Sequence, residues 1–200
     1  MDIKITEAGV NAEKKALRRE YRMLRSAVPA DERAKRDRAV CETLADFLRA
    51  RKPEKVFFYA PMGFEIDVMP LFSVCAAAGL SCGFPRCETE TSTMKFYEVS
   101  SEEQFLTGAY GIREPGPDCP VLCPDCSSVI LVPGLVYDTD GYRVGFGKGY
   151  YDRFLASFPG ISVGIVYDEF VLPHVPRGEF DLPVNCLAAE KGVRTIHAIE

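Results

Sequence analysis

One stretch of the sequence, residues 129–152, constrains the fold more than any other. It begins with an uninterrupted apolar run, Val129–Val132, which is typical of a buried strand in a parallel sheet. Turn signals follow at Pro133-Gly134 and at Asp140-Gly141, and a helical pattern begins at about Tyr150. A buried strand that leads through a glycine-containing loop into a helix predicts an α/β unit.

Three alternate glycines in this loop, Gly145, Gly147 and Gly149, remove every second side chain. Backbone N–H groups in such a loop can approach a ligand closely, and next to a helix N-terminus they favour an anion, above all phosphate. Lys148 adds a point charge, and Arg143 supplies a planar donor fork. The residue types of this loop therefore indicate a phosphate site.

A carboxylate, Asp152, follows the glycines within the same short stretch and could hold Mg²⁺ beside bound phosphates. The glycine run fits neither the P-loop pattern nor the dinucleotide-binding fingerprint. Taken alone it could be a turn that only joins a strand to a helix. Together with the two cations and the carboxylate, it predicts nucleotide chemistry.

The segment from Pro133 to Asp138, then Gly141, then the run from Arg143 to Asp152, resembles the signature of 5-formyltetrahydrofolate cyclo-ligases, also called 5,10-methenyltetrahydrofolate synthetases. Shorter matches extend the resemblance over nearly the whole chain. It implies an ATP- and Mg²⁺-dependent cyclisation of 5-formyltetrahydrofolate to 5,10-methenyltetrahydrofolate, with release of ADP and phosphate. In that reaction the formyl oxygen accepts the γ-phosphoryl group of ATP, and N10 of the folate attacks the activated carbon.

The resemblance also implies roles for individual residues. Lys148 and Arg143 become the catalytic residues that offset phosphate charge. The pattern Lys14-x-x-Leu17-Arg18 matches an N-terminal element whose Lys and Arg contact ATP. The full set of expected ATP ligands is Lys14, Arg18, Arg143, Gly145, Gly147, Lys148, Gly149, Tyr150 and Tyr151.

Two aspartates, Asp152 and Asp181, are the expected Mg²⁺ ligands by the same resemblance. Members of the family usually carry Asp where this chain has Asn185, so that residue is not assigned to the metal. Glu65 matches the folate-binding Glu of a strand-end element, although Val68 replaces the usual Thr. The expected substrate-binding residues are Ala60, Glu65, Phe146, Tyr150 and Tyr151.

Strands that alternate with helices predict an α/β fold in three layers, with a largely parallel sheet flanked by helices. The resemblance implies a Rossmann-like fold of the NagB/RpiA/CoA-transferase type. Helices are expected at 12–27, from a cap at Asp31 to about 51, at 68–78 and from about 150, and strands at 55–60, 80–84, 94–99, 129–132, 161–167 and 192–196.

Two hundred residues fit one domain, residues 1–200, in which residues 1–10 form a mobile lead-in. The helix that follows places Leu17, Tyr21, Leu24 and Val28 on one apolar stripe. We expect a monomer.

The formal net charge is −5, but residues 11–38 carry ten basic and five acidic residues, a local charge of +5. The acidic remainder argues against a nucleic-acid partner. No run approaches the roughly 20 apolar residues of a membrane span, which predicts a cytoplasmic protein with no membrane partner. In such a compartment the eight cysteines are expected to be free thiols.

Several alternatives remain open on the sequence alone. Cys119, Cys123 and Cys126 could bind zinc, with Cys87 or another residue as the fourth ligand. A catalytically inactive folate- or nucleotide-binding protein would keep the same fold. A nucleic-acid protein using the basic helix would bind with strong salt dependence. A cysteine hydrolase using His174 or His197 would lack any recognisable local signature.

Overall fold

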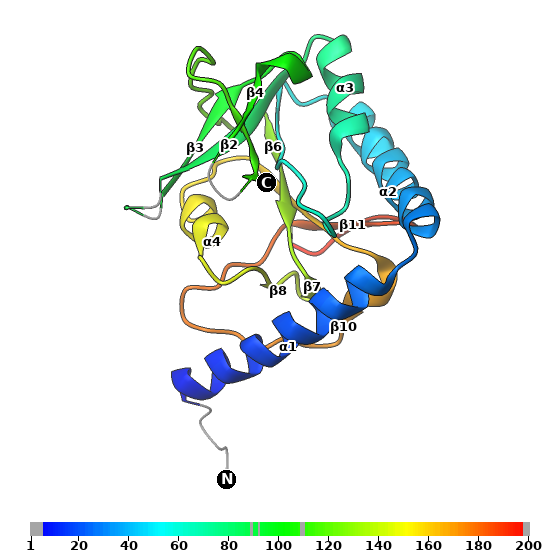
Figure 1. Cartoon of the computed structure of the whole chain (residues 1–200), viewed down its shortest axis with the longest axis vertical. Helices are drawn as coiled ribbons and strands as arrows, with labels where there is room; N and C mark the ends of the chain where they lie inside the picture. The colour runs from blue at the N-terminus through cyan, green and yellow to red at the C-terminus, as the bar shows by residue number, and fades with distance from the viewer. Residues whose placement is uncertain (1–5, 89, 92, 109–110, 198–200) are drawn as a thin grey trace.

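The computed structural model describes residues 6–88, 90–91, 93–108 and 111–197. Its centre is a seven-stranded sheet in the order β12-β11-β9-β6-β1-β2-β3 (Figure 1). The five inner strands are parallel, and only the edge strands β3 and β12 run antiparallel. The strands are β1 (Lys55–Phe57), β2 (Ser81–Glu88), β3 (Thr93–Glu98), β6 (Ser128–Pro133), β9 (Ile161–Ile165), β11 (Cys186–Ala189) and β12 (Gly192–Thr195). The predicted largely parallel α/β sheet is confirmed.

Two smaller sheets accompany the central one. A three-stranded sheet, in the order β10-β7-β8, lies next to helix α1 at the lower end of the molecule in Figure 1, and a two-stranded sheet pairs β4 with β5. The smaller strands are β4 (Phe105–Thr107), β5 (Arg113–Pro115), β7 (Val136–Asp138), β8 (Arg143–Val144) and β10 (Val171–Leu172). The helices are α1 (Glu7–Ala27), α2 (Ala30–Arg51), α3 (Met69–Ala77) and α4 (Tyr150–Leu155), with short 3-10 turns at Glu102–Gln104 and Asp168–Phe170.

Two consecutive phenylalanines show how the layers form. Because successive side chains of a strand point to opposite faces, Phe57 and its neighbour Phe58 pack against different helices. Phe57 meets Phe158, just after α4, with ring centroids 5.8 Å apart, whereas Phe58 meets Phe72 of α3 at 5.9 Å. Helices α2 and α3 therefore cover one face of the sheet and α4 the other, as Figure 1 shows.

The N-terminal expectation was wrong for residues 7–10. Helix α1 begins at Glu7, because the side chain of Thr6 accepts a hydrogen bond from the amide of Gly9 (3.3 Å) and caps the helix. Val10 is buried, which anchors this first part of the helix. Residues 1–5 lie outside the described part of the chain.

Helix α2 also starts differently from the expectation. Its N-cap is Pro29, which has no side-chain hydrogen bond, and Asp31 lies in the first turn instead of capping. A carboxylate in the first turn still complements the helix dipole. The short parallel strand β11 was not predicted, because its four residues carry no alternation, all four being buried.

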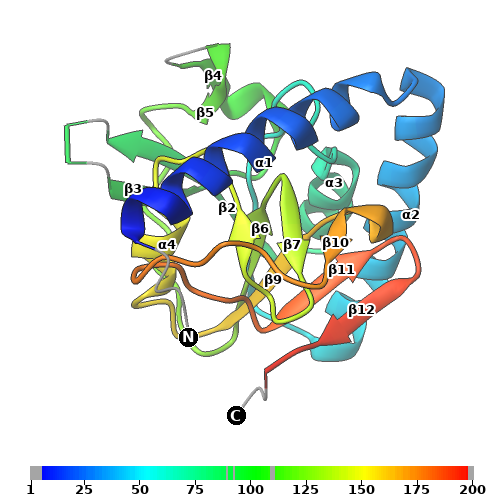
Figure 2. The same ribbon diagram turned by 90° about the horizontal axis from the view of Figure 1, so that it is seen from below.

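The carboxyl ends of the parallel strands lead into the loops that matter for function. β1 leads to residues 58–68, β6 to the hairpin formed by β7 and β8, and that hairpin to the glycine loop, residues 145–149. Helix α1 contacts β8 and crosses this end of the molecule (Figure 2). In the described part of the chain, none of the helices combines the length and apolar content that a bilayer crossing requires.

Candidate active site

Helix α1 brings its cations to the glycine loop from far away in the sequence. Arg18 Nε donates a 2.8 Å hydrogen bond to the carbonyl of Gly145, 127 residues away. Burial, followed by the neighbouring charge of Arg22, lowers the pKa of Arg18 from its ordinary value. Lys14, one helical turn earlier, is buried and pairs with Asp181. Two of the predicted ATP ligands therefore lie beside the predicted phosphate loop.

A second ion pair lies inside the loop region. Arg143 is buried in β8, and its Nη2 donates to Asp152 Oδ1 at 2.8 Å. Its Nη1 donates to the carbonyl of Leu182 at 3.0 Å, and the amide of Leu182 lies 3.3 Å from the same Asp152 oxygen. Asp181 and Asp152, the two predicted metal ligands, thus lie close to each other through residues 181–182.

The backbone conformation of the glycine loop explains why two of its three glycine positions require glycine. Gly147 has a φ of +90° and Gly149 a φ of +68°, a region that side chains with a Cβ rarely adopt. A Cβ at Gly147 would also lie 3.0 Å from the guanidinium carbon of Arg18. Gly145 differs, because a Cβ there would meet no atom of the described chain within 4 Å. The space beside Gly145 is open to a ligand.

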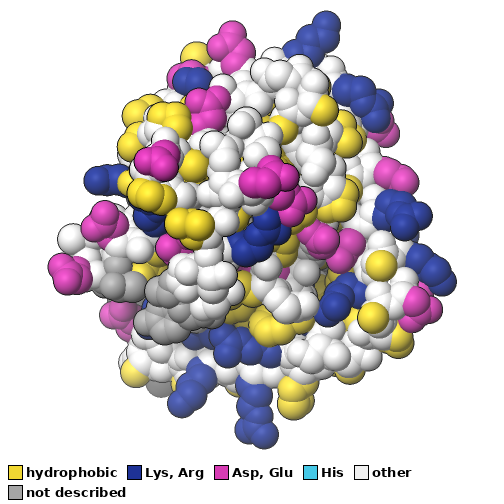
Figure 3. All heavy atoms as spheres, turned by 45° about the horizontal axis from the view of Figure 1, so that its top comes forward, with side chains coloured by type: hydrophobic (Ala, Val, Ile, Leu, Met, Phe, Trp, Pro, Cys, Tyr) yellow, Lys and Arg dark blue, Asp and Glu magenta, His cyan; other side chains and the backbone are white. Residues whose placement is uncertain are grey.

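The amides of this loop are available as donors. Among the described residues, the N–H groups of Gly145, Gly147, Lys148 and Gly149 have no hydrogen-bond acceptor. The side chain of Lys148 is exposed. Exposed basic side chains also line the lower edge of the face in Figure 3. Helix α4 has only six residues, so the loop amides rather than a long helix dipole supply the positive potential.

Glu65, the predicted folate ligand, is a buried carboxylate in the loop after β1. Its Oε2 accepts from the amide of Met62 at 2.8 Å. Burial raises the pKa of Glu65 to about 7, although the Met62 amide and the charge of Arg25 act in the opposite direction. Burial, followed by the charge of Glu65, raises the pKa of Tyr151 well above its ordinary value. The charge of Glu65 therefore acts on Tyr151, a partly buried residue at the start of α4.

Aromatic contacts join the Glu65 loop to the glycine loop. The rings of Phe64 and Phe146 lie 6.1 Å apart, and the guanidinium of Arg22 lies 5.5 Å from the Phe146 ring. Tyr150 is half-buried under the guanidinium of Arg153, 5.7 Å from the ring. Ala60 is buried and offers only a methyl group to a pocket wall. The predicted substrate residues thus border the predicted nucleotide loop.

Both predicted metal ligands have a carboxylate oxygen available for Mg²⁺. Asp152 and Asp181 each use one oxygen in the bonds above, and the second oxygen of each has no partner among the described residues. No group of three or more His, Cys, Asp or Glu side chains suited to a metal occurs in the described part of the chain. Mg²⁺ is commonly held by one or two carboxylates together with substrate phosphates, so this pair fits a metal that arrives with a nucleotide.

The cysteine alternative finds no support in the structure. All eight cysteines are free thiols, as expected, and within the described residues Cys119, Cys123 and Cys126 form no metal-type group. Cys119 is buried, whereas Cys123 and Cys126 are exposed.

A cavity of about 720 Å³ borders the Glu65 loop. Helix α2, residues 61–71 and Arg113 line it, and Glu65 is its only predicted site residue. None of residues 143–152 lines this cavity. The glycine loop therefore does not border this cavity.

Two cations near the site were missed at the sequence level. Arg25 is almost fully buried, donates to the carbonyls of Gly134 (2.8 Å) and Leu135 (3.0 Å), and so holds the turn after β6. Its position, eleven residues after Lys14 and seven after Arg18, places it on the same helical face, and that spacing could have identified it. Arg177 gives no such signal, because its segment has no periodic pattern.

Fold and site together define an α/β protein whose candidate site lies at the carboxyl ends of a parallel sheet, where such proteins bind their ligands. The model of the 5-formyltetrahydrofolate cyclo-ligase family matches residues 10–190, and the chain belongs to this family of ligases.

Relatives and solved structures agree with this assignment. A 5-formyltetrahydrofolate cyclo-ligase from Mus musculus is 24% identical over 188 residues, covering 88% of this chain and 93% of the relative. A solved 5,10-methenyltetrahydrofolate synthetase from Aquifex aeolicus is 34% identical with a TM-score of 0.81, covering 92% of this chain and 93% of the other. A synthetase from Mycoplasma pneumoniae, 22% identical with a TM-score of 0.70, covers 88% of this chain and 98% of its own and supports the fold alone.

Proposed function

We propose that this protein catalyses the ATP- and Mg²⁺-dependent cyclisation of 5-formyltetrahydrofolate to 5,10-methenyltetrahydrofolate. The names of its relatives support the substrate and the activity. The single observation that carries the site is the meeting of Arg18 with Gly145, which joins the basic helix to the glycine loop.

The reaction begins with a poor electrophile, because the formamide nitrogen donates electron density into the formyl carbonyl. The formyl oxygen attacks the γ-phosphorus of ATP, and the bond from that phosphorus to the bridging oxygen breaks to release ADP. The formyl carbon becomes an iminium-type centre that carries phosphate as its leaving group. N10 then donates its electron pair to this carbon, loses its proton, and phosphate departs with the C–O electrons.

The residues of the site position the substrates and neutralise charge, which is what phosphoryl transfer chiefly requires. Lys14, Arg18, Arg143 and Lys148 offset the phosphate charge. The free amides of Gly145, Gly147 and Gly149 bind phosphate oxygens, and Tyr150 and Tyr151 pack against the ligands. Asp152 and Asp181 would hold Mg²⁺, which supplies further positive charge to the phosphates.

Two ion pairs of the site support a joint requirement for metal and nucleotide. Lys14 pairs with Asp181, and Arg143 pairs with Asp152. With Mg-ATP present, Lys14 and Arg143 would pair with phosphate oxygens and Asp152 and Asp181 would hold the metal, so no charge would be left without a partner. ATP alone would leave two carboxylates facing phosphate.

The substrate side of the site is assigned to Glu65, Ala60 and Phe146. The carboxylate of Glu65 uses Oε2 for the Met62 amide, and its other oxygen can accept a hydrogen bond from the amino or ring N–H groups of a pterin. The apolar walls from Ala60 and Phe146 suit the flat ring. We further propose that the protein is a monomer in the cytoplasm, formed by one domain over residues 1–200, with neither nucleic acid nor membrane as a partner.

The test is direct. Purified protein is mixed with 5-formyltetrahydrofolate and Mg-ATP, and absorbance is followed at the band of the methenyl product, with reactions lacking ATP or Mg²⁺ as controls. We expect product only in the complete mixture. Tight binding of folate or nucleotide without product would favour the alternative, a catalytically inactive binding protein of the same fold.

A further inference from the structure

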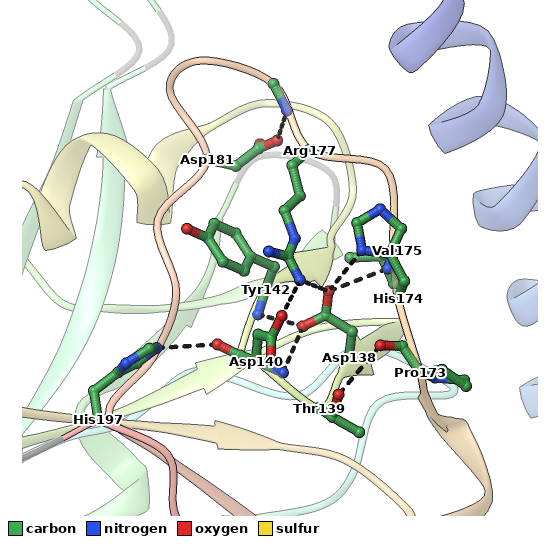
Figure 4. A network of polar contacts seen from close by, with 11 residues as sticks. Asp138, Thr139, Asp140, Tyr142, Pro173, His174, Val175, Arg177, Asp181 and His197 are labelled. Atoms are coloured by element: carbon green, nitrogen blue, oxygen red, sulfur yellow. Dashed lines mark hydrogen bonds and ion pairs between the residues drawn. The ribbon is translucent and has the colours of Figure 1, made fainter. Parts of the chain in front are cut away.

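A buried carboxylate that the proposed reaction does not use lies at the end of β7. Asp138 has no exposed surface, and its Oδ1 accepts hydrogen bonds from the amides of Asp140 and Tyr142, both at 3.0 Å (Figure 4). These bonds close the turn between β7 and β8. The turn fixes the direction in which β8 enters the glycine loop.

The other oxygen of Asp138 reaches a distant part of the chain. Oδ2 accepts from the amide of Val175 at 3.1 Å and from Nη2 of Arg177 at 2.8 Å. A carboxylate offers about four acceptor positions, so this side chain is fully used. Asp138 thereby ties the hairpin to residues 173–182, which we call the C-terminal strap.

Arg177 strengthens the same connection. Its Nη2 also bonds Asp140 at 2.6 Å, and its guanidinium lies 4.0 Å from the centre of the Tyr142 ring. Figure 4 shows the guanidinium between the two aspartates and the tyrosine. Two carboxylates and one aromatic face therefore hold a single side chain of the strap.

The strap contains no helix or strand between Pro173 and Leu182, so side-chain contacts such as these hold it in place. Thr139 Oγ1 donates to the carbonyl of Pro173 at 3.1 Å, which holds the start of the strap to the hairpin. Gly178, the residue after Arg177, donates its amide to Asp181, and Asp181 pairs with Lys14. The position of Arg177 therefore determines where the Asp181 carboxylate lies.

We propose that Asp138 and Arg177 are positioning residues that hold the strap, and with it Asp181, in the arrangement that binds Mg-nucleotide. This inference rests on the proposed function, because it assigns the strap to the nucleotide side of that site. Neither residue contacts the reacting atoms. Loss of the tie should weaken the nucleotide and leave the folate side, built on the distant Glu65 loop, unchanged.

The experiment compares Arg177→Ala and Arg177→Lys with the control Arg36→Ala. Arg36 is a matched residue: it also bonds two carboxylates, Glu169 (2.5 Å) and Glu190 (2.7 Å), and lies 3.9 Å from the ring of Tyr167. It belongs to α2 and does not touch the strap. Both alanine variants thus lose the same types of contact.

Titration calorimetry with Mg²⁺ and a non-hydrolysable ATP analogue gives the nucleotide dissociation constant without requiring turnover. We expect a rise of about tenfold in Arg177→Ala, partial recovery in Arg177→Lys, and a change of less than about twofold in Arg36→Ala. The KM for 5-formyltetrahydrofolate should stay within about twofold in all three. Amide exchange at Val175 and Gly178 should accelerate in Arg177→Ala only.

Equal nucleotide affinities in Arg177→Ala and Arg36→Ala would overturn the inference, and so would unchanged exchange in the strap. An increase in the folate KM matching the increase in nucleotide dissociation constant would show a general disturbance and would also overturn it. If the wild-type protein forms no product, the proposed function fails, while the calorimetric and exchange measurements still decide the role of Arg177.

Discussion

Asp138, the last residue of β7, and Asp181, in the C-terminal strap, lie at the same end of the molecule, yet their surroundings differ. Asp138 is fully buried and uses both oxygens in four hydrogen bonds. Asp181 is partly exposed and uses one oxygen, with Lys14 and the amide of Gly178 as its partners. A carboxylate with every acceptor position filled maintains structure, whereas one with a free oxygen beside an open loop can take a ligand.

Asp152 follows the second pattern. Its side chain is 25% exposed, its Oδ1 bonds Arg143 and the amide of Leu182, and its Oδ2 has no partner among the described residues. The comparison therefore predicts that substitutions at the two kinds of site affect different properties, either activity or stability. Changes at Asp152 or Lys148 should damage the reaction, and changes at Asp138 should damage the fold.

The largest expected effect is on turnover. Asp152→Ala and Lys148→Ala should each lower kcat by about 10²- to 10³-fold, because Asp152 would hold Mg²⁺ and Lys148 supplies positive charge to the transferring phosphoryl group. Steady-state assays of product formation, with melting curves to confirm folding, make the comparison. Lys191→Ala is a suitable control, since this exposed lysine only forms a 3.9 Å pair with Asp168. Near-normal turnover in either site variant would contradict the assignment.

A loss of stability is expected next, at the buried carboxylate. Asp138→Asn should reduce the free energy of unfolding by about 3 kcal/mol, because Arg177 loses a charged partner and one amide loses its acceptor. Asp181→Asn should reduce that free energy by less, about 1–2 kcal/mol, because the Asp181 side chain is 20% exposed and the amide oxygen can still accept a hydrogen bond from Lys14. Urea unfolding of the two variants beside wild type measures both values. Equal losses in the two variants would remove the distinction between these aspartates.

Glu65, another buried carboxyl group, adds a pH dependence, because burial raises its pKa. With a folded pKa of about 7 against an ordinary 4.5, the native state binds more protons than the unfolded chain between these values. Stability contributed by this group is therefore present at low pH and is lost as pH rises towards 7, by up to about 3 kcal/mol.

Glu65→Gln keeps the acceptor for the Met62 amide and removes the charge. The variant should lack this part of the pH slope, so its advantage in unfolding free energy over wild type should be larger at pH 8 than at pH 5. Urea unfolding at both values makes the measurement. Parallel pH profiles for the two proteins would mean that the carboxyl group of Glu65 titrates normally.

The smallest expected effects concern the glycine loop. Gly145→Ala should leave the melting temperature within about a degree, because the new methyl meets open space, and should weaken Mg-ATP several-fold by occupying it. Gly147→Ala should cost about 1–2 kcal/mol of stability, since its φ is +90° and Arg18 lies against it. Melting curves and nucleotide titrations separate the two, and a destabilised Gly145→Ala would mean that the space is not open.

The sequence was most informative where a local pattern and the final structure agree. The apolar run of β6, the turn at Asp140-Gly141 and the start of α4 at Tyr150 all lie where they were expected. Hydrophobic runs and turn residues act over a few positions, so they can be read without knowledge of distant contacts. The N-terminal helix was predicted less well, because Leu24 of the expected apolar stripe is 45% exposed while Lys14 and Arg25 are buried.

By itself, the sequence determined the α/β class, the parallel sheet, the glycine loop and the family, because these depend on residue types at short spacing. Only the tertiary structure decided which charges meet. Lys14 pairs with Asp181, Arg18 hydrogen-bonds the glycine loop, and Asp138 accepts a hydrogen bond from Arg177, 39 residues away. Such pairs arise from the packing of whole elements. The strap has no helix or strand, so its sequence has no periodic pattern from which these contacts could be predicted.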